Sequence, residues 1–123
     1  VKNVFTVERD ECLEGDAYST SKSLCVKSVL HFYQVPISIS VAVLNNQEWD
    51  RTGNITTVPK TTQPIKGWHA ITIYEADDKN KLFRFKNSWG TSWGNGGHGV
   101  ISYDYVNRYA TEAWVGYEKA LRQ

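Results

Sequence analysis

The chain has 123 residues, of which 41% are hydrophobic, 13% aromatic and 22% charged. These proportions are typical of a globular domain and exclude a disordered or fibrous chain. The chain has 14 lysines and arginines against 13 aspartates and glutamates, which leaves a formal net charge of +1. Since no basic cluster stands out, we predict no nucleic-acid partner. No apolar run approaches the roughly 20 residues that cross a bilayer, so we also predict no membrane partner.

The chain begins at Val1 and contains no methionine, so we expect further encoded residues before it. No repeat or linker-like stretch divides the sequence, and we interpret 1–123 as a single domain. Cys12 and Cys25 are too few for a disulfide scaffold, and their spacing fits neither a zinc site nor a CxxC pair. The two cysteines could still form one disulfide with each other. The location of the chain is therefore not assigned, with a secreted or other extracytoplasmic location favoured.

The first predicted element is a helix over 20–34, which Pro36 ends. Its apolar residues recur at helical spacing: Cys25, Val26, Val29, Leu30, Phe32 and Tyr33. A strand over 36–44 follows, with alternate apolar residues on one face: Ile37, Ile39, Val41 and Val43. Residues 45–66 are polar and contain Gly53, Pro59 and Pro64, which predicts a long loop.

Two alternating segments, 69–74 and 82–87, flank a turn at 77–80 and predict a β-hairpin. A loop of about five residues centred on Asp78 pairs His69 with Asn87 and makes one face apolar through Ile71, Ile73, Phe83 and Phe85. In so short a chain this face has little cover, so we expect it to be exposed and to favour self-association.

The predicted register places an imidazole and a carboxamide side by side, because directly opposed residues hold their Cβ atoms about 5 Å apart. Asn87 can accept a hydrogen bond from His69 and fix its tautomer, which leaves the other ring nitrogen as a base. This is the orienting and basic half of a nucleophilic triad. A lone histidine near a strand end is more often structural. The glycine-rich run 88–99 carries Trp89 and Trp93, whose indoles either exclude water from the pair or plug the core.

These residues resemble the C-terminal half of a papain-like (C1-type) cysteine peptidase. The resemblance rests on Trp68-His69-Ala70, on Asn87-Ser88-Trp89-Gly90 and on Gly97-His98-Gly99. The helix and strand over 20–42 are similar to those that open the family's second domain, and the segments 103–105 and 109–115 are similar to bacterial members.

The resemblance implies the papain-like right-hand domain, an α+β fold with an N-terminal helix packed on a twisted antiparallel sheet or half barrel. It implies that His69 and Asn87 are catalytic, with support from Trp89 and Trp93, and that Gly67 and Trp68 line the substrate cleft. It further implies a peptide or protein substrate and no cofactor or metal. The expected partner is an N-terminal half, from the same precursor or a separate chain, that carries the nucleophile.

Neither cysteine fits that nucleophile, which in the family precedes the histidine by roughly 130 residues or more. Cys25 lies inside the predicted helix on its apolar side, and the acidic residues around Cys12 raise a thiol pKa. We therefore expect the chain alone to be inactive.

Two other functions stay open. One is a non-catalytic module that binds a partner or accompanies a toxin, which the missing nucleophile and the bulky Trp68 favour. The other is a transferase or deamidase with the same Cys–His geometry. We interpret His98 as a turn residue, and the glycosylation sequon Asn54-Ile55-Thr56 matters only in a secreted chain.

Overall fold

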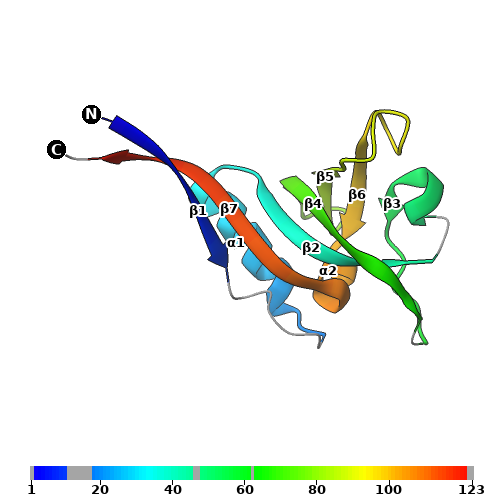
Figure 1. Cartoon of the computed structure of the whole chain (residues 1–123). Helices are drawn as coiled ribbons and strands as arrows, with labels where there is room; N and C mark the ends of the chain where they lie inside the picture. The colour runs from blue at the N-terminus through cyan, green and yellow to red at the C-terminus, as the bar shows by residue number, and fades with distance from the viewer. Residues whose placement is uncertain (1, 11–17, 46–47, 62, 122–123) are drawn as a thin grey trace.

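The computed structural model of the chain describes residues 2–10, 18–45, 48–61 and 63–121, with side chains for 18–115 apart from these gaps and position 51. Among the described residues, no helix is both long and apolar enough to cross a membrane. The elements follow in chain order (Figure 1): β1 (Lys2–Asp10), α1 (Ser21–Tyr33), β2 (Ile37–Leu44), a π-helical turn η2 (Glu48–Thr52), β3 (Asn54–Ile55), β4 (Ile65–Asp77), β5 (Leu82–Lys86), β6 (His98–Ser102), α2 (Tyr103–Tyr109) and β7 (Ala110–Leu121).

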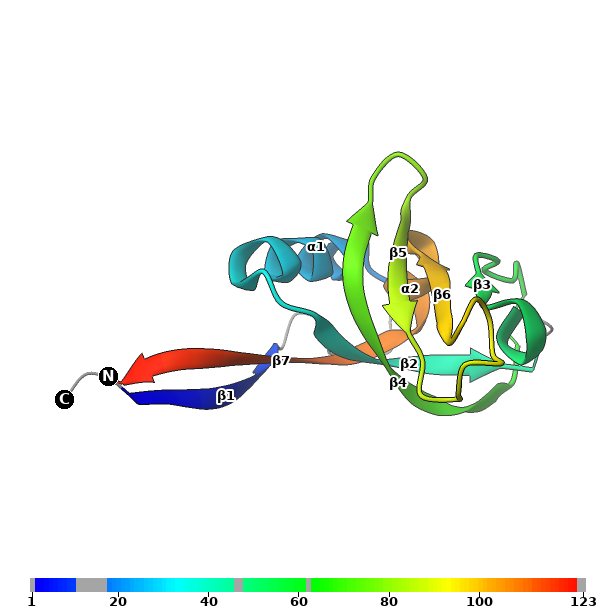
Figure 2. The ribbon, with the colours of Figure 1, turned by 90° about the horizontal axis from the view of Figure 1, so that it is seen from above.

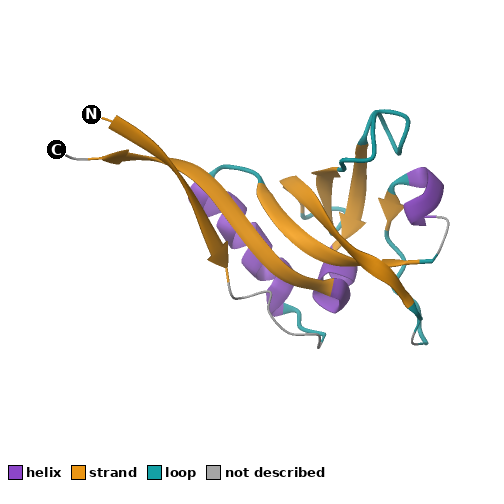
Figure 3. Cartoon of the chain, in the orientation of Figure 1, coloured by secondary structure: helices purple, strands orange, loops and turns teal. Residues whose placement is uncertain are grey.

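The described strands form one twisted sheet in the order β1-β7-β2-β4-β5-β6-β3. Neighbouring strands are antiparallel except β3 and β6, which are parallel. Strands β1 and β7 continue beyond the rest of the sheet as a two-stranded ribbon (Figure 2). Both α-helices lie on the same side of β2 and β7 (Figure 3). The predicted α+β fold, a helix on a twisted and mainly antiparallel sheet, is confirmed, although β1 precedes the helix.

Helix α1 lies within the predicted range and ends where the backbone turns left-handed at Gln34, φ 55°. The Gln34 N–H donates to the Leu30 carbonyl, 2.9 Å away. Val26 and Val29 are buried, but Phe32, which belongs to the same helical pattern, is 78% exposed. Phe32 stands at the margin of the apolar stripe, about 120° around the helix from Val26.

The hairpin forms, but its predicted register is wrong. Ile73 lies opposite Phe85 instead of Phe83, and a bulge follows between Ile73 and Glu75. The turn is set by the Asp77 carboxylate, which accepts hydrogen bonds from the backbone and side-chain nitrogens of Asn80. The loop is therefore centred beyond Asp78. Because the error at the open end is two residues, the faces of the strands are still those predicted, whereas a shift of one would have exchanged them.

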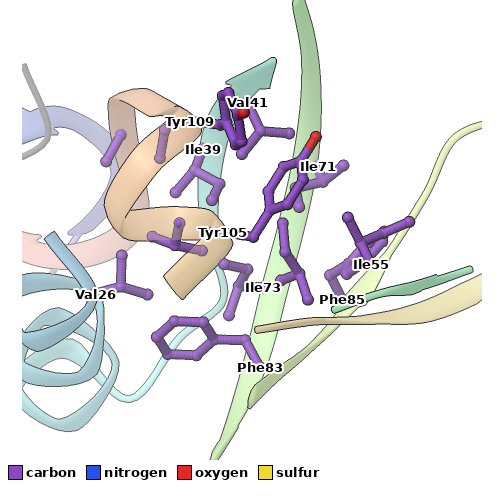
Figure 4. Packing of buried hydrophobic residues seen from close by; sticks show 14 of the residues in the cluster. Val26, Ile39, Val41, Ile55, Ile71, Ile73, Phe83, Phe85, Tyr105 and Tyr109 are labelled. Carbon is purple, nitrogen blue, oxygen red and sulfur yellow. The ribbon is translucent and has the colours of Figure 1, made fainter. Parts of the chain in front are cut away.

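The apolar face of the hairpin is buried, which corrects the expectation that it is exposed. Ile71, Ile73, Phe83 and Phe85 are at most 2% exposed. Figure 4 shows them packed with Val26 of α1 and with Tyr105 and Tyr109 of α2. The cover comes from α1 and from α2, a helix that the sequence reading left out, so this face provides no basis for self-association.

Candidate active site

His69 and Asn87 meet at the open end of the hairpin. His69 lies on β4 opposite Val41 of β2, and Asn87 directly follows β5. The backbone N–H of Asn87 donates to the Gly97 carbonyl at 2.9 Å, which fixes where the side chain begins. Nε2 of His69 is 2.5 Å from Oδ1 of Asn87. The predicted contact therefore exists, although it is not made as a directly opposed cross-strand pair.

The hydrogen bonds around Asn87 assign the tautomer of the imidazole. The backbone N–H of Ser88 donates to the Asn87 side chain at 2.8 Å. Because a peptide N–H can only donate, the atom that it meets must be the amide oxygen. That oxygen can only accept from His69, so Nε2 carries the proton. In the neutral ring, Nδ1 is then the nitrogen with a free lone pair and is the base of the pair.

Asn87 is 5% exposed, so its contact with the imidazole is made largely out of water. Its Nδ2 finds no hydrogen-bond partner among the described residues. An amide buried in this way is costly, since an unsatisfied polar group loses its hydration. The position is therefore occupied by asparagine at a cost in stability, as residues at functional sites often are.

The two predicted indoles take different places. Trp89 stacks on His69, with ring centroids 4.6 Å apart and planes 30° apart, and it is 43% exposed. Trp93 is buried and meets Trp89 edge to face at 5.6 Å. The two roles that the sequence allowed for these indoles thus fall on different residues. Trp89 covers the imidazole, and Trp93 fills the core behind it.

Trp49, which the sequence reading missed, lies beneath this stack. It is fully buried in η2, and its ring meets those of His69 at 6.5 Å and Trp89 at 6.1 Å. Its carbonyl accepts a hydrogen bond of 2.7 Å from Nε1 of Trp93. Trp49 was missed because it lies in a polar stretch of the sequence. The indole itself could have predicted a buried residue there, because so large an apolar ring is rarely fully exposed to solvent.

Glycines allow the loop after Asn87 to approach η2. Gly94 has φ +56°, and a Cβ there would stand 2.5 Å from the His98 carbonyl oxygen. Gly53, with φ +69°, would place a Cβ 3.1 Å from the Gly94 Cα. A side chain at either position would force these two segments apart. The glycines therefore permit the contact that seats Trp93 against Trp49.

Gly67 and Trp68 directly precede His69 on β4. Trp68 lies opposite Ala42 and is 50% exposed, and Gly67 lies opposite Val43 with no atom within 4 Å of an added Cβ. The surface beside His69 is therefore open at Gly67 and aromatic at Trp68.

Cys25 is disulfide-bonded and half-buried against the core, so it supplies no thiolate in this state. Cys12 lies outside the described residues. His98 was expected in a turn but begins β6, and its Nδ1 lies 3.1 Å from the Tyr74 hydroxyl. No group of three or more His, Cys, Asp or Glu residues in the described part of the chain could hold a metal ion.

Comparison with known proteins places the chain in a family. The family model for papain family cysteine proteases matches residues 6–117. An uncharacterised peptidase C1-like protein of Acanthamoeba polyphaga mimivirus is 33% identical over 72 residues, which are 57% of this chain and 23% of that protein.

Solved structures give the same result for the fold. Xylellain, a cysteine protease from Xylella fastidiosa, is 26% identical with a TM-score of 0.59, over 72% of this chain and 33% of that one. The Carica candamarcensis cysteine protease CMS1MS2 shares the fold at 20% identity and a TM-score of 0.51, over 73% of this chain and 43% of that one.

The fold is that of a cysteine protease domain, and the chain belongs to the papain family. It spans about a quarter of the length of the curated relative and a third of xylellain. The similarity to bacterial members in particular is not established by these comparisons.

Proposed function

We propose that this single domain supplies the histidine and asparagine of a papain-family cysteine peptidase, and that its nucleophile is a cysteine outside these 123 residues. The observation that carries the proposal is the hydrogen bond from Nε2 of His69 to Asn87, with the amide oriented by the Ser88 N–H. It leaves Nδ1 as a base of defined direction, which a thiol nucleophile requires. Gly67 and Trp68 flank His69 and would border the substrate, with Trp89 and Trp93 as support.

The proposed reaction begins when the cysteine S–H transfers its proton to Nδ1 of His69. The thiolate attacks the peptide carbonyl carbon, and the C–N bond breaks as the Nδ1 proton moves to the leaving amine. A thioester remains. A water molecule then gives one proton to Nδ1, its oxygen attacks the thioester, and the C–S bond breaks to release the carboxylic acid. Asn87 holds the imidazole in one orientation through both proton transfers.

The need for an external nucleophile follows from the cysteines of the chain. Cys25, which lies in α1, is disulfide-bonded. The sequence around Cys12 is acidic, which disfavours a thiolate there. We therefore infer that the domain is inactive alone and is completed by an N-terminal half, encoded in the same precursor or as a separate chain.

The test is to express the chain together with the residues encoded before Val1 and to react the product with an E-64-type epoxide. Covalent labelling of a cysteine in the added segment should occur and should be lost in His69→Ala. His31→Ala, which changes an exposed histidine on α1, is the matched control and should label normally. Robust peptide cleavage by the 123 residues alone, with Cys12→Ser and Cys25→Ser, contradicts the proposal.

A non-catalytic partner-binding or toxin-associated module is the second candidate. It is favoured by Trp68, a half-exposed indole that directly precedes His69. The encoded sequence before Val1 separates the two functions. A cysteine followed by an aromatic residue roughly 90–150 residues before His69 favours the peptidase, and its absence favours the binding module.

A further inference from the structure

A chain of hydrogen bonds leads from β2 to the aromatic residues around His69. The Tyr105 hydroxyl donates to the Ala42 carbonyl at 2.6 Å, and Nε1 of Trp49 donates to that hydroxyl at 2.9 Å. Nε1 of Trp93 then donates to the Trp49 carbonyl at 2.7 Å. Trp49 and Tyr105 are fully buried, and Trp93 is nearly so. Water therefore does not compete for these three bonds.

Trp49 links this series of hydrogen bonds to the rings of His69 and Trp89. Its ring packs against both rings of the stack, the half-buried His69 and the exposed Trp89, lying edge-on to His69 with planes 88° apart and at 61° to Trp89. It also packs against Phe85 and Tyr105, with centroids 6.3 and 6.1 Å away. A ring enclosed on several sides has one orientation, and it limits how far the two rings above it can tilt.

The backbone of Trp49 is fixed independently of its ring. The Glu48 carboxylate accepts hydrogen bonds from the backbone N–H and hydroxyl groups of Thr56 and Thr57. The Gly53 N–H donates to the Glu48 carbonyl at 3.0 Å, which closes the turn. These bonds hold the turn that contains the Trp49 carbonyl, the acceptor of the Trp93 N–H.

The Tyr105 hydroxyl joins this cluster to the sheet from α2. Burial raises the pKa of Tyr105 well above its usual range, so the group is protonated at neutral pH. A protonated hydroxyl can donate to Ala42 and accept from Trp49 at the same time. Phenylalanine at this position would remove the acceptor of the Trp49 N–H and a donor to the Ala42 carbonyl.

We propose that Trp49 and Tyr105 are positioning residues, whose hydrogen bond fixes the stack of Trp89 on His69 and thereby the hydrogen bond between His69 and Asn87. The inference deepens the proposed function, because a peptidase needs the imidazole in one orientation. Its physical content, the coupling of Tyr105 to the state of His69, concerns this chain alone. It can therefore be measured without a nucleophile.

The test compares Tyr105→Phe and Trp49→Phe with Tyr103→Phe in the 123-residue chain. Tyr103 is the matched control because it is a buried tyrosine of the same helix whose hydroxyl donates to Asp78, away from the site. The ring nitrogens of His69 are observed by nitrogen-15 NMR, which reports the tautomer, and exchange of the Nε2–H with water is measured on the same sample. The tautomer does not change through a loss of stability alone. Because exchange also accelerates when the domain opens, the exchange rate is compared with that of the Tyr103→Phe control.

Tyr105→Phe removes both hydrogen bonds of the hydroxyl and should accelerate Nε2–H exchange about tenfold or more, and Tyr103→Phe should leave it unchanged. Trp49→Phe should give a similar acceleration, and the double variant should show less than the product of the two effects. Trp49→Phe keeps a ring at the centre of the cluster and decides the question if Tyr105→Phe does not fold. Exchange equal to that of the control in both positioning variants overturns the inference.

The two proposals fail in different ways. Suppose that the chain expressed with the residues encoded before Val1 is not labelled by the epoxide, but exchange is faster in the Tyr105 and Trp49 variants. The positioning inference then holds and the proposed peptidase function does not. If labelling depends on His69 but exchange is unaffected in both variants, the reverse is true.

Discussion

Replacing Asn87 with alanine should change the state of His69 far more than it changes the stability of the domain. The substitution removes the acceptor of two hydrogen bonds, from His69 and from the Ser88 N–H. A buried donor left without a partner costs about 1–3 kcal/mol. Ser88 is exposed, so water can replace one bond, and removing the unpartnered Nδ2 offsets part of the other. We expect a net loss of about 1 kcal/mol in the free energy of unfolding.

The assay is chemical denaturation followed by tryptophan fluorescence, combined with nitrogen-15 NMR of the imidazole. The wild-type ring should be a single Nε2–H tautomer, and Asn87→Ala should give a mixture of both. Asn107→Ala is the matched control, since Asn107 is equally buried and accepts from the Ser23 N–H, 2.8 Å away and outside the site. A single Nε2–H tautomer in Asn87→Ala would refute the reasoning, as would a stability loss above about 4 kcal/mol.

Three further predictions concern stability. Burial raises the pKa of Tyr105, so the contribution of its protonated hydroxyl to the stability of the fold is complete below pH 10 and is lost as the pH rises further. Thermal unfolding should show this loss of stability at alkaline pH in wild type, and a smaller loss in Tyr105→Phe. The hydrogen bond from Tyr103 lowers the pKa of Asp78, so the stabilisation by ionised Asp78 is present above about pH 4 and lost below it. The stability of Tyr103→Phe should therefore fall less steeply with acid than that of wild type, and identical curves of stability against pH would show that this hydrogen bond does not stabilise the fold. Gly94→Ala should cost about 2 kcal/mol or more, because the added Cβ meets the His98 carbonyl in a left-handed turn, whereas Gly96→Ala, with φ +60° and open space, should cost about 1 kcal/mol; equal losses in denaturation would show that the close approach is unimportant.

The sequence was sufficient for the hairpin faces, because alternation is a local property. His69 does contact Asn87, but not through the directly opposed pairing from which the contact was predicted. The sequence was insufficient for the register. The register depends on the Asp77 side chain, which caps the turn through Asn80, and on the bulge after Ile73. Neither feature follows from alternation alone.

The cover of the site could not be predicted because it comes from residues distant in sequence. Trp49 stands in a stretch whose composition indicates a loop, and its burial depends on Tyr105, 56 residues later. The hydrogen bonds of Glu48 to Thr56 and Thr57 make that stretch compact. The expectation of an exposed apolar face failed for the same reason, since α2 was not among the predicted elements.

The claim on which this account depends most is that His69 activates a thiol supplied by another segment. The most direct measurement is the second-order rate of epoxide labelling in the chain joined to its encoded preceding residues. The account predicts labelling of one cysteine in that segment, with a rate reduced at least a hundredfold in His69→Ala, as expected for the loss of a general base. Labelling at the same rate in wild type and His69→Ala would contradict it.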